Sequence, residues 1–343
     1  MAPMGIRLSP LGVAVFCLLG LGVIYHLYAG VISSRLAAFR QKRDVDLRDL
    51  LAVSVEAAVL GGKEVKRIRE EDGLKEKSKG KTKEGATELL TMGDLQSHRK
   101  MFNLLKNTFP DITVSLHSFV SKSQRHLSWT RDVPADILEK IDRGKMVPVD
   151  GVTVWIDPLD AYAGVHRESA QIRHNNGVRG GTGQTRHRGD TPAFYWFHCL
   201  GLRRSGSNMR SRSAYSVNPP TVIVSRSHSG KVKSFIQEAF GNTTIIPAGG
   251  AGYKVLSLLE MPSHDEKPID QADVYVHVTL IKKWDICAGA ALLSALGGQM
   301  TTLKGEDIDF SGTPVNKGGL VASVGVNHKV LVDRLPAWDP ENH

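Results

Sequence analysis

Two aspartates lie three positions apart at the end of an apolar stretch, in the sequence GVTVWIDPLD. Pro158 excludes helical geometry at Asp157, so the chain is expected to run extended and then turn. Such a turn can bring the carboxylates of Asp157 and Asp160 to one cation. The carbonyl of Leu159 is a further hard oxygen donor, and a donor set of this kind suits Mg²⁺. The alternative is an ordinary Asp-Pro turn with an acid at the surface.

Two further acids stand where helices are expected to begin. In WDICAGAALLSALGG, Asp285 occupies the place of a helix N-cap, and Gly289 permits close packing against a neighbouring helix. An acid there can bind a metal while the positive end of the helix lies beside a phosphate. In LLTMGDLQSHR, Asp94 can orient a water that attacks phosphorus. For both residues, a plain capping role is the alternative.

Two polar turns follow predicted strands and can hold an anion. The turn at 247–254, PAGGAGYK, is rich in glycine, so its backbone N–H groups can approach a phosphate that Lys254 neutralises. It is not a Walker A sequence, and a glycine-rich turn alone is not specific. The run SRSHSG at 225–230 offers hydroxyls and an imidazole, with helix capping as the alternative for its later serines.

The elements that must position these residues alternate between strand and helix. Apolar spacing predicts a long helix over 45–70 and an amphipathic helix from near Asp94 to Phe109. The lysine run at 75–85 predicts a solvated loop. Later segments each begin as a strand, turn, and continue as a helix, at 219–230, 243–260, 272–298 and 318–335. This alternation indicates an α/β body.

The N-terminus predicts a membrane anchor. Residues 8–34 contain no Asp, Glu, Lys or Arg, and the stretch is long enough to cross a bilayer as a helix. It is too long for a signal peptide and lacks a clean cleavage site. We therefore divide the chain into an anchor with its short tip, 1–34, and a body, 35–343. Basic residues after the anchor favour a cytoplasmic body, whereas the sequon at Asn242 favours a lumenal, glycosylated one.

The formal charge of +9 is unevenly distributed. The segment 161–205 holds seven Arg, no Lys and two acids, so it alone supplies 7 − 2 = +5. It shows neither a strand nor a helix period, so we expect it to form neither. A nucleic-acid-binding arm is the alternative, but all of its aromatic residues except Tyr162 cluster at 194–197 instead of alternating with the basic ones. We expect no nucleic-acid partner.

Taken in order, five motifs resemble those of one family: TMGD, WIDPLD, VSRSHSG, PAGGAGYK and WDICAG. They are similar to the lithium-sensitive, Mg²⁺-dependent phosphatases of the inositol monophosphatase superfamily. The resemblance is strongest to its membrane-anchored Golgi branch, which acts on 3′-phosphoadenosine 5′-phosphate. It covers roughly 1–114, 133–160 and 206 to the C-terminus.

The resemblance implies a layered αβαβα sandwich, α/β with an α+β first half, in the Golgi lumen behind a single type II transmembrane helix. It implies release of the 3′-phosphate to leave AMP, with inositol phosphates as alternative substrates, and it leaves a homo-oligomer open. It assigns Mg²⁺ binding to Asp157, Leu159, Asp160 and Asp285. It assigns water activation to Asp94, and substrate binding to Ser225, His228, Gly250 and Lys254.

Two segments, 115–131 and 161–205, depart from the family pattern. No acid occurs from Ile112 to Arg131, where the family has a metal-binding glutamate, and Asp160 is followed by Ala161 instead of threonine. Both segments begin and end abruptly beside well-matched sequence. We interpret them as products of translation in a shifted reading frame or of translated intron sequence. An inactive form of the enzyme is therefore an alternative to the active one.

Overall fold

The computed structural model describes two units of the chain, 1–43 and 44–343, and each is considered by itself. The residues that it describes are 9–39, 44–71, 76–81, 87–115, 146–160, 173–180, 184–192, 199–202, 206–207, 209–226, 229–260 and 269–338. His228 lies outside these ranges, as does nearly all of the segment 115–131.

The first unit contains the helix α1 (Pro10–Phe39), which continues past the expected boundary at Ser34. Its stretch Pro10–Ala29 is long and apolar enough to cross a membrane, with a mean hydropathy of 2.0. Large apolar side chains such as Leu18 and Ile24 are exposed along it. Length and composition thus make α1 a candidate anchor, as the sequence predicts.

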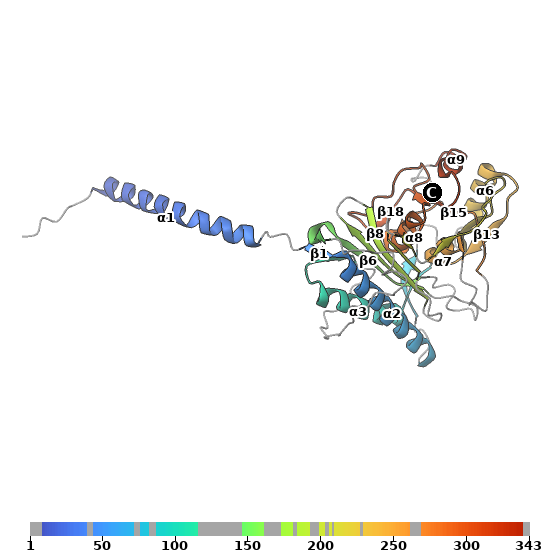
Figure 1. The fold of residues 1–343 in the computed structure, drawn as a ribbon, viewed down its shortest axis with the longest axis horizontal. Coiled ribbons are helices and arrows are strands. Elements are labelled where there is room, and N and C mark those ends of the chain that lie inside the picture. The colour runs from blue at the N-terminus through green and yellow to red at the C-terminus, as the bar shows by residue number, and fades with distance from the viewer. Residues whose placement is uncertain are drawn as a thin grey trace, which may run out of the picture. The chain divides into compact units, whose positions relative to one another are not determined.

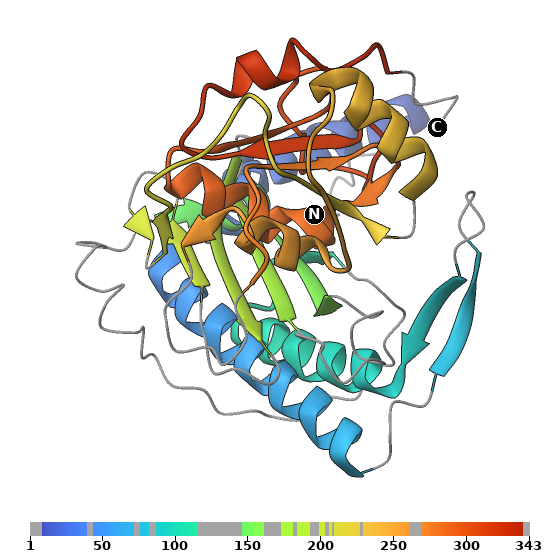
Figure 2. The same cartoon turned by 90° about the vertical axis from the view of Figure 1, so that its right-hand side faces the viewer.

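The second unit begins with two helices that lie side by side, α2 (Leu47–Glu71) and α3 (Met92–Thr108) (Figure 2). Gly61 of α2 permits this contact, because a Cβ there would lie 2.7 Å from Ser97 Oγ and from Met101 Sδ of α3. Glu64 also joins the helices through a 2.7 Å ion pair with Lys100. Burial alone would raise the pKa of Glu64, but hydrogen bonds from Arg67 and Lys100 lower it below its ordinary value.

These helices cover one face of a six-stranded sheet. The strand order is β10-β9-β8-β7-β6-β4, with β4 parallel to β6 and the other pairs antiparallel. The strands are β4 (Thr113–Ser115), β6 (Thr153–Asp160), β7 (Arg173–Gly180), β8 (Gln184–Pro192), β9 (Cys199–Leu202) and β10 (Gly206–Ser207). Strand β6 is therefore an inner strand, with β4 and β7 as its neighbours.

Two helices, α7 (Ala251–Leu256) and α8 (Lys283–Ala295), separate this sheet from a second one (Figures 1 and 2). The second sheet has the order β13-β12-β15-β19-β17. Its strands are β12 (Val222–Ser225), β13 (Ile245–Ala248), β15 (Val274–His277), β17 (Gln299–Thr301) and β19 (Leu320–Ser323). Helices α6 (Ser229–Phe240) and α9 (His328–Val332) follow β12 and β19 and pack on its outer face.

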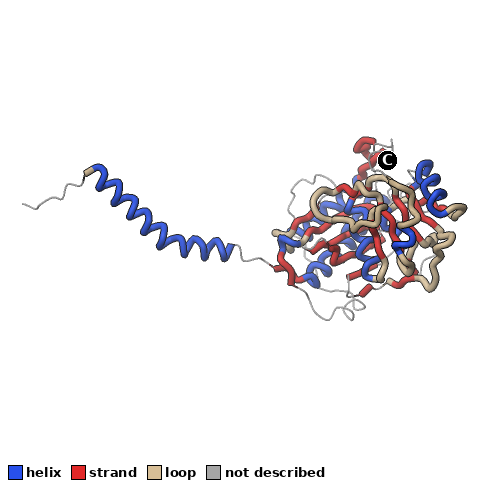
Figure 3. The backbone as a smooth tube through the Cα atoms, turned by 90° about the horizontal axis from the view of Figure 1, so that it is seen from above, coloured by secondary structure: helices blue, strands red, loops and turns tan. Residues whose placement is uncertain are grey.

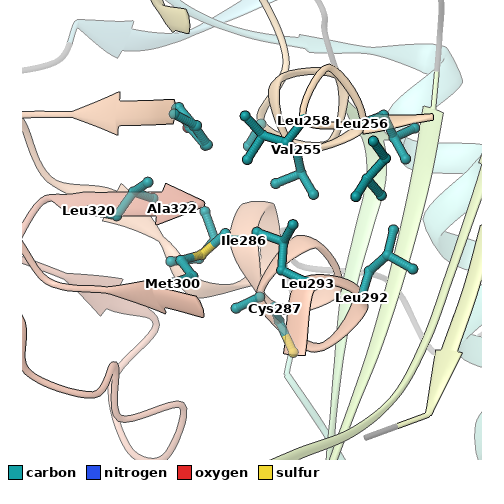
Figure 4. Close-up of a cluster of buried hydrophobic side chains, with 14 of the residues drawn as sticks. Val255, Leu256, Leu258, Ile286, Cys287, Leu292, Leu293, Met300, Leu320 and Ala322 are labelled. Carbon is teal, nitrogen blue, oxygen red and sulfur yellow. The ribbon is translucent and has the colours of Figure 1, made fainter. Parts of the chain in front are cut away.

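The layers therefore alternate as α, β, α, β, α, and the expected sandwich is confirmed. Figure 3 shows the alternation of helix and strand within the 44–343 unit. Three buried clusters fill the spaces between the layers. The largest includes side chains of α7, α8 and the second sheet, among them Val255, Ile286 and Leu320 (Figure 4).

The remaining strands are short and pair antiparallel. They are β1 (Asp44–Asp46) with β5 (Met146–Pro148), β2 (Glu76–Lys81) with β3 (Thr87–Thr91), β11 (Arg210–Ser211) with β14 (Leu259–Glu260), and β16 (Ile281–Lys282) with β18 (Val315–Asn316). A single 3-10 turn, η1 (Val149–Gly151), joins β5 to β6.

Two expectations about irregular segments are wrong. Part of the lysine run forms β2, where a loop was expected. The segment 161–205 contains β7, β8 and β9, although its residues show no strand period. The reason is that pairing uses the backbone: a buried strand such as β6 needs hydrogen-bond partners along both edges, whatever side chains its neighbour carries.

A buried histidine connects the second sheet to α9. His328 is 6% exposed, and its Nε2 lies 2.9 Å from Thr301 Oγ1 while its Nδ1 lies 2.8 Å from Ser323 Oγ. Burial lowers the pKa of His328 to about 4. The imidazole is thus neutral in the folded protein under conditions where an exposed histidine begins to titrate.

We expect this histidine to make the fold sensitive to acid. Between its folded pKa of about 4 and its unfolded value of 6.5, the unfolded chain binds more protons, so stability falls as pH is lowered through this window. The loss attributable to His328 is about 3 kcal/mol at most. Urea unfolding at pH 7 and pH 5 measures it, and His328→Gln should have the smaller pH dependence. Equal pH dependence in both proteins would contradict this assignment.

Candidate active site

The segment of β6 that carries the aspartates is held from two sides. Trp155 lies with its ring centroid 6.4 Å from that of Trp284 in α8, and its Nε1 donates a 3.2 Å hydrogen bond to the carbonyl of Phe310. On the other side, Ser97 Oγ of α3 donates a 3.1 Å hydrogen bond to the carbonyl of Pro158. The strand is therefore fixed between α3 and the first turn of α8.

Alternation along β6 decides which way its side chains face. Val154 and Ile156 belong to the buried cluster under α2 and α3, whereas Trp155 belongs to the cluster around α7 and α8. Because side chains of a strand alternate between its faces, Asp157 shares the face of Trp155. The carboxylate of Asp157, 3% exposed, thus lies on the side of the sheet that α8 covers.

The other two acids lie in the first turns of their helices. Asp94 is 4% exposed in α3, three positions before Ser97, and Asp285 is half-buried in α8, directly after Trp284. The N-cap of α8 is Lys282, so the expectation that Asp285 caps the helix is wrong. An acid in the first turn is still stabilised by the helix dipole.

A bulge follows Asp157. The pairing of β6 with β7 shifts register between Asp157 and Asp160, so the strand continues through Pro158 where a turn was expected. Bulges re-aim side chains and recur beside active sites. The side chains of Leu159 and Asp160 lie outside what the structure describes, and only their backbone is placed in β6.

The donors available here suit a hard cation, since they are carboxylates and a backbone carbonyl. Asp157 and Asp285 lie on two packed elements, two positions after Trp155 and one position after Trp284 respectively, and these two tryptophans are in contact. Within the described ranges, no group of three or more His, Cys, Asp or Glu side chains is gathered for a metal. A role of these residues in binding a metal therefore stays a prediction.

Three of the four expected substrate-binding residues, Ser225, Gly250 and Lys254, lie at or shortly after the carboxyl ends of parallel strands, and His228 lies outside the described residues. Ser225 ends β12 and lies in register with Ala248 of β13. Gly250 follows with a φ of 77°, a conformation that favours glycine, and starts α7. Lys254 is 3% exposed; its Nζ donates a 2.6 Å hydrogen bond to the Gly250 carbonyl and lies 5.2 Å from the Tyr275 ring centroid.

Close packing joins this turn to the acid-bearing helix. A Cβ on Gly289 of α8 would collide with the side chain of Val255 in α7, so the predicted close approach at Gly289 is confirmed. The packing of α7 on α8, together with that of α8 on β6, places the glycine-rich turn and the aspartates in one layered assembly. An alanine at Gly289 would push the two helices apart.

One basic residue was missed by sequence reasoning. The guanidinium of Arg226, directly after β12, lies against the backbone of Gly249, with Nη2 2.5 Å from the position of a Cβ there. The available signal was its place between Ser225 and Ser227 in SRSHSG. Asn242, the expected glycosylation site, is exposed in the turn after α6.

A parallel-strand edge, a glycine-rich turn and buried acids on layered elements are consistent with an enzyme that acts on a phosphate, and the comparisons specify its family. The model for the inositol monophosphatase family matches residues 269–337. "Inositol monophosphatase 3" of Danio rerio is 59% identical over 340 residues, covering 99% of each chain. The "Golgi-resident adenosine 3′,5′-bisphosphate 3′-phosphatase" of Homo sapiens is 48% identical over 361 residues, covering 100% of each.

Solved structures show the same fold. An IMPase of Thermotoga maritima superposes with a TM-score of 0.59 at 16% identity, covering 83% of this chain and 96% of its own. The extragenic suppressor protein suhB of Bartonella henselae also gives a TM-score of 0.59. The chain belongs to the inositol monophosphatase family and is a phosphatase, a phosphoric monoester hydrolase.

Proposed function

We propose that this phosphatase removes the 3′-phosphate of 3′-phosphoadenosine 5′-phosphate in a Mg²⁺-dependent reaction that leaves AMP. The observation that carries the proposal is the fixation of β6 between Ser97 of α3 and Trp284 of α8, which gathers acid-bearing elements around Asp157. The proposal is supported by the names of full-length relatives, including the Golgi-resident bisphosphate phosphatases of Homo sapiens and Bos taurus, both 48% identical.

The residues divide into two groups. Asp157, Asp160, Asp285 and the Leu159 carbonyl would hold Mg²⁺, which when bound makes a water more acidic and neutralises phosphate oxygens. Asp94, buried in the first turn of α3, would orient the attacking water through its carboxylate. Ser225, His228, Gly250 and Lys254 would hold the nucleotide in line with that water.

The test is phosphate release by the purified full chain in detergent. We expect release from 3′-phosphoadenosine 5′-phosphate in the presence of Mg²⁺, loss of release in a chelator, and no release from AMP. Release from AMP at a comparable rate would contradict the assignment of the 3′-phosphate as the leaving group.

Inositol monophosphates are the second candidate substrates. The relative that is 59% identical over 99% of both chains is named "Inositol monophosphatase 3", which favours this candidate. The same assay with inositol 1-phosphate decides between the two, because a true inositol phosphatase would release phosphate from it at least as efficiently as from the nucleotide.

An inactive form is the third candidate, favoured by the absence of any acid from Ile112 to Arg131. Sequencing the transcript across codons 115 and 161 tests our interpretation of the two departing segments, and an mRNA that encodes them in frame would contradict it. If the chain as written releases no phosphate, restoring a glutamate and the strands of its relatives should restore activity.

We propose a Golgi membrane location, with α1 as a single type II anchor and the phosphatase unit in the lumen. The helix α1 and the names of the relatives support this. A lumenal body predicts glycosylation at Asn242, because Asn242 and Thr244 of the sequon are both exposed. In secretory cells, the chain should lose apparent mass on treatment with an N-glycosidase, and Asn242→Gln should not. If the chain is instead unmodified and is digested by a protease added on the cytosolic side of intact membranes, the body lies in the cytosol.

A further inference from the structure

The glycine-rich turn is flanked by two cations with different surroundings. Lys254 lies beneath the turn, 3% exposed, with its Nζ engaged by the Gly250 carbonyl and its charge over the Tyr275 ring. Arg226 lies on the turn at Gly249 and is half-buried. Lys254 therefore supports the turn from inside, and Arg226 is the cation of the pair that keeps a solvent-facing surface.

The Arg226 guanidinium is positioned by shape. Its Nη2, Cζ and Nε lie 2.5, 3.4 and 3.6 Å from the point where a Cβ on Gly249 would be. The Nη2 end of the planar group thus occupies the space that the missing side chain leaves, and the rest of the group lies in contact with it. Among the residues that the structure describes, no hydrogen bond or ion pair involves this side chain. Within the described ranges, its donors are therefore available to a ligand.

A guanidinium held in this way suits a phosphate. Its fixed fork of N–H donors matches two phosphate oxygens at once, and ordering it beforehand lowers the entropy cost of binding. Arg226 follows Ser225 at the carboxyl edge of β12, whereas the acids that handle the reacting phosphate are on β6, α3 and α8. A phosphate bound by Arg226 would therefore meet a different element from those that carry the acids, as a second phosphate of the same substrate would.

We propose that Arg226, held by Gly249, binds the phosphate that is not hydrolysed and so makes this site selective for substrates with two phosphates over those with one. This inference rests on the proposed function, since it names the group that separates a nucleotide bisphosphate from an inositol monophosphate at the same site. Arg226 touches substrate without taking part in the reaction.

The test compares dissociation constants of the full chain for adenosine 3′,5′-bisphosphate and adenosine 3′-monophosphate, measured by calorimetry in a chelator so that no turnover occurs. The wild-type chain should bind the bisphosphate more tightly. Arg226→Ala should weaken bisphosphate binding by roughly 10- to 100-fold, the effect expected for a charged hydrogen-bonded pair. Monophosphate binding should change by less than about twofold, because that ligand lacks the group in question.

Two variants separate this role from a structural one. Gly249→Ala places a methyl group where the guanidinium lies and should lower the same selectivity ratio, whereas Arg226→Lys should give an intermediate ratio. Lys233→Ala removes an exposed charge from α6 and should leave the ratio unchanged. A wild-type ratio near one, or a ratio unchanged in Arg226→Ala, would overturn the inference. Absence of phosphate release with Mg²⁺ would instead overturn the proposed function. The ratio of the two dissociation constants would still test the role of Arg226 in binding.

Discussion

Asp157→Asn is expected to lower kcat/KM for 3′-phosphoadenosine 5′-phosphate by about 1000-fold, which corresponds to about 4 kcal/mol of transition-state stabilisation. Asp157 is 3% exposed on the α8 side of β6, where its carboxylate is a proposed metal donor. An amide of the same shape keeps an oxygen but loses the negative charge that attracts the cation. The measurement is steady-state phosphate release by the full chain across a range of Mg²⁺ concentrations.

Asp150→Asn is the matched control, because Asp150 is exposed in η1, just before β6. This variant should retain activity within about twofold, as surface substitutions usually do. Added Mg²⁺ should raise the melting temperature of the wild-type chain and of Asp150→Asn, and have less effect on Asp157→Asn. An Asp157→Asn protein that is as active as wild type would remove Asp157 from the site.

Trp155→Ala is expected to have the largest effect on stability. Trp155 is 1% exposed, packs against Trp284, and donates its Nε1 hydrogen to the Phe310 carbonyl. Its removal leaves a large cavity between β6 and α8, at a cost of about 3 to 5 kcal/mol. That is a large part of the roughly 5 to 15 kcal/mol by which most domains are stable. Urea unfolding followed by circular dichroism of the full chain measures the loss.

Trp155→Phe separates packing from hydrogen bonding. It keeps an aromatic ring beside Trp284 but leaves the Phe310 carbonyl without its donor, so the expected cost is smaller, about 1 to 3 kcal/mol. If Trp155→Ala and Trp155→Phe lose the same amount of stability, the ring contact between β6 and α8 does not contribute as described.

The second half of the fold could be predicted from local sequence. Several strands there are followed closely by a helix, so short-range patterns fix those elements, and β12 with α6 or β13 with α7 appear where they are expected. The packing role of Gly289 was also predictable, because a glycine among alanines in a buried helix indicates close approach.

The first half could not be predicted in the same way. The strands after β6 have Arg and Gly where a strand pattern needs apolar residues, and their pairing depends on an edge that only the folded chain creates.

In the candidate site, the start of α8 was misjudged by a few residues, since Asp285 lies within the first turn and not at the cap. Arg226 was missed because its significance comes from Gly249, 23 positions further along the chain.

Strand β6 separates two buried hydrophobic clusters, one on each of its faces, and this affects how variants of the enzyme should be interpreted. In β6, the side chains of Val154 and Ile156 pack into one cluster, and the side chain of Trp155 packs into the other. A substitution in α2 that is remote from any substrate would therefore reach Asp157 through the backbone of this single strand. Loss of turnover in such a variant would reflect a displacement of β6, although every reacting residue is still present.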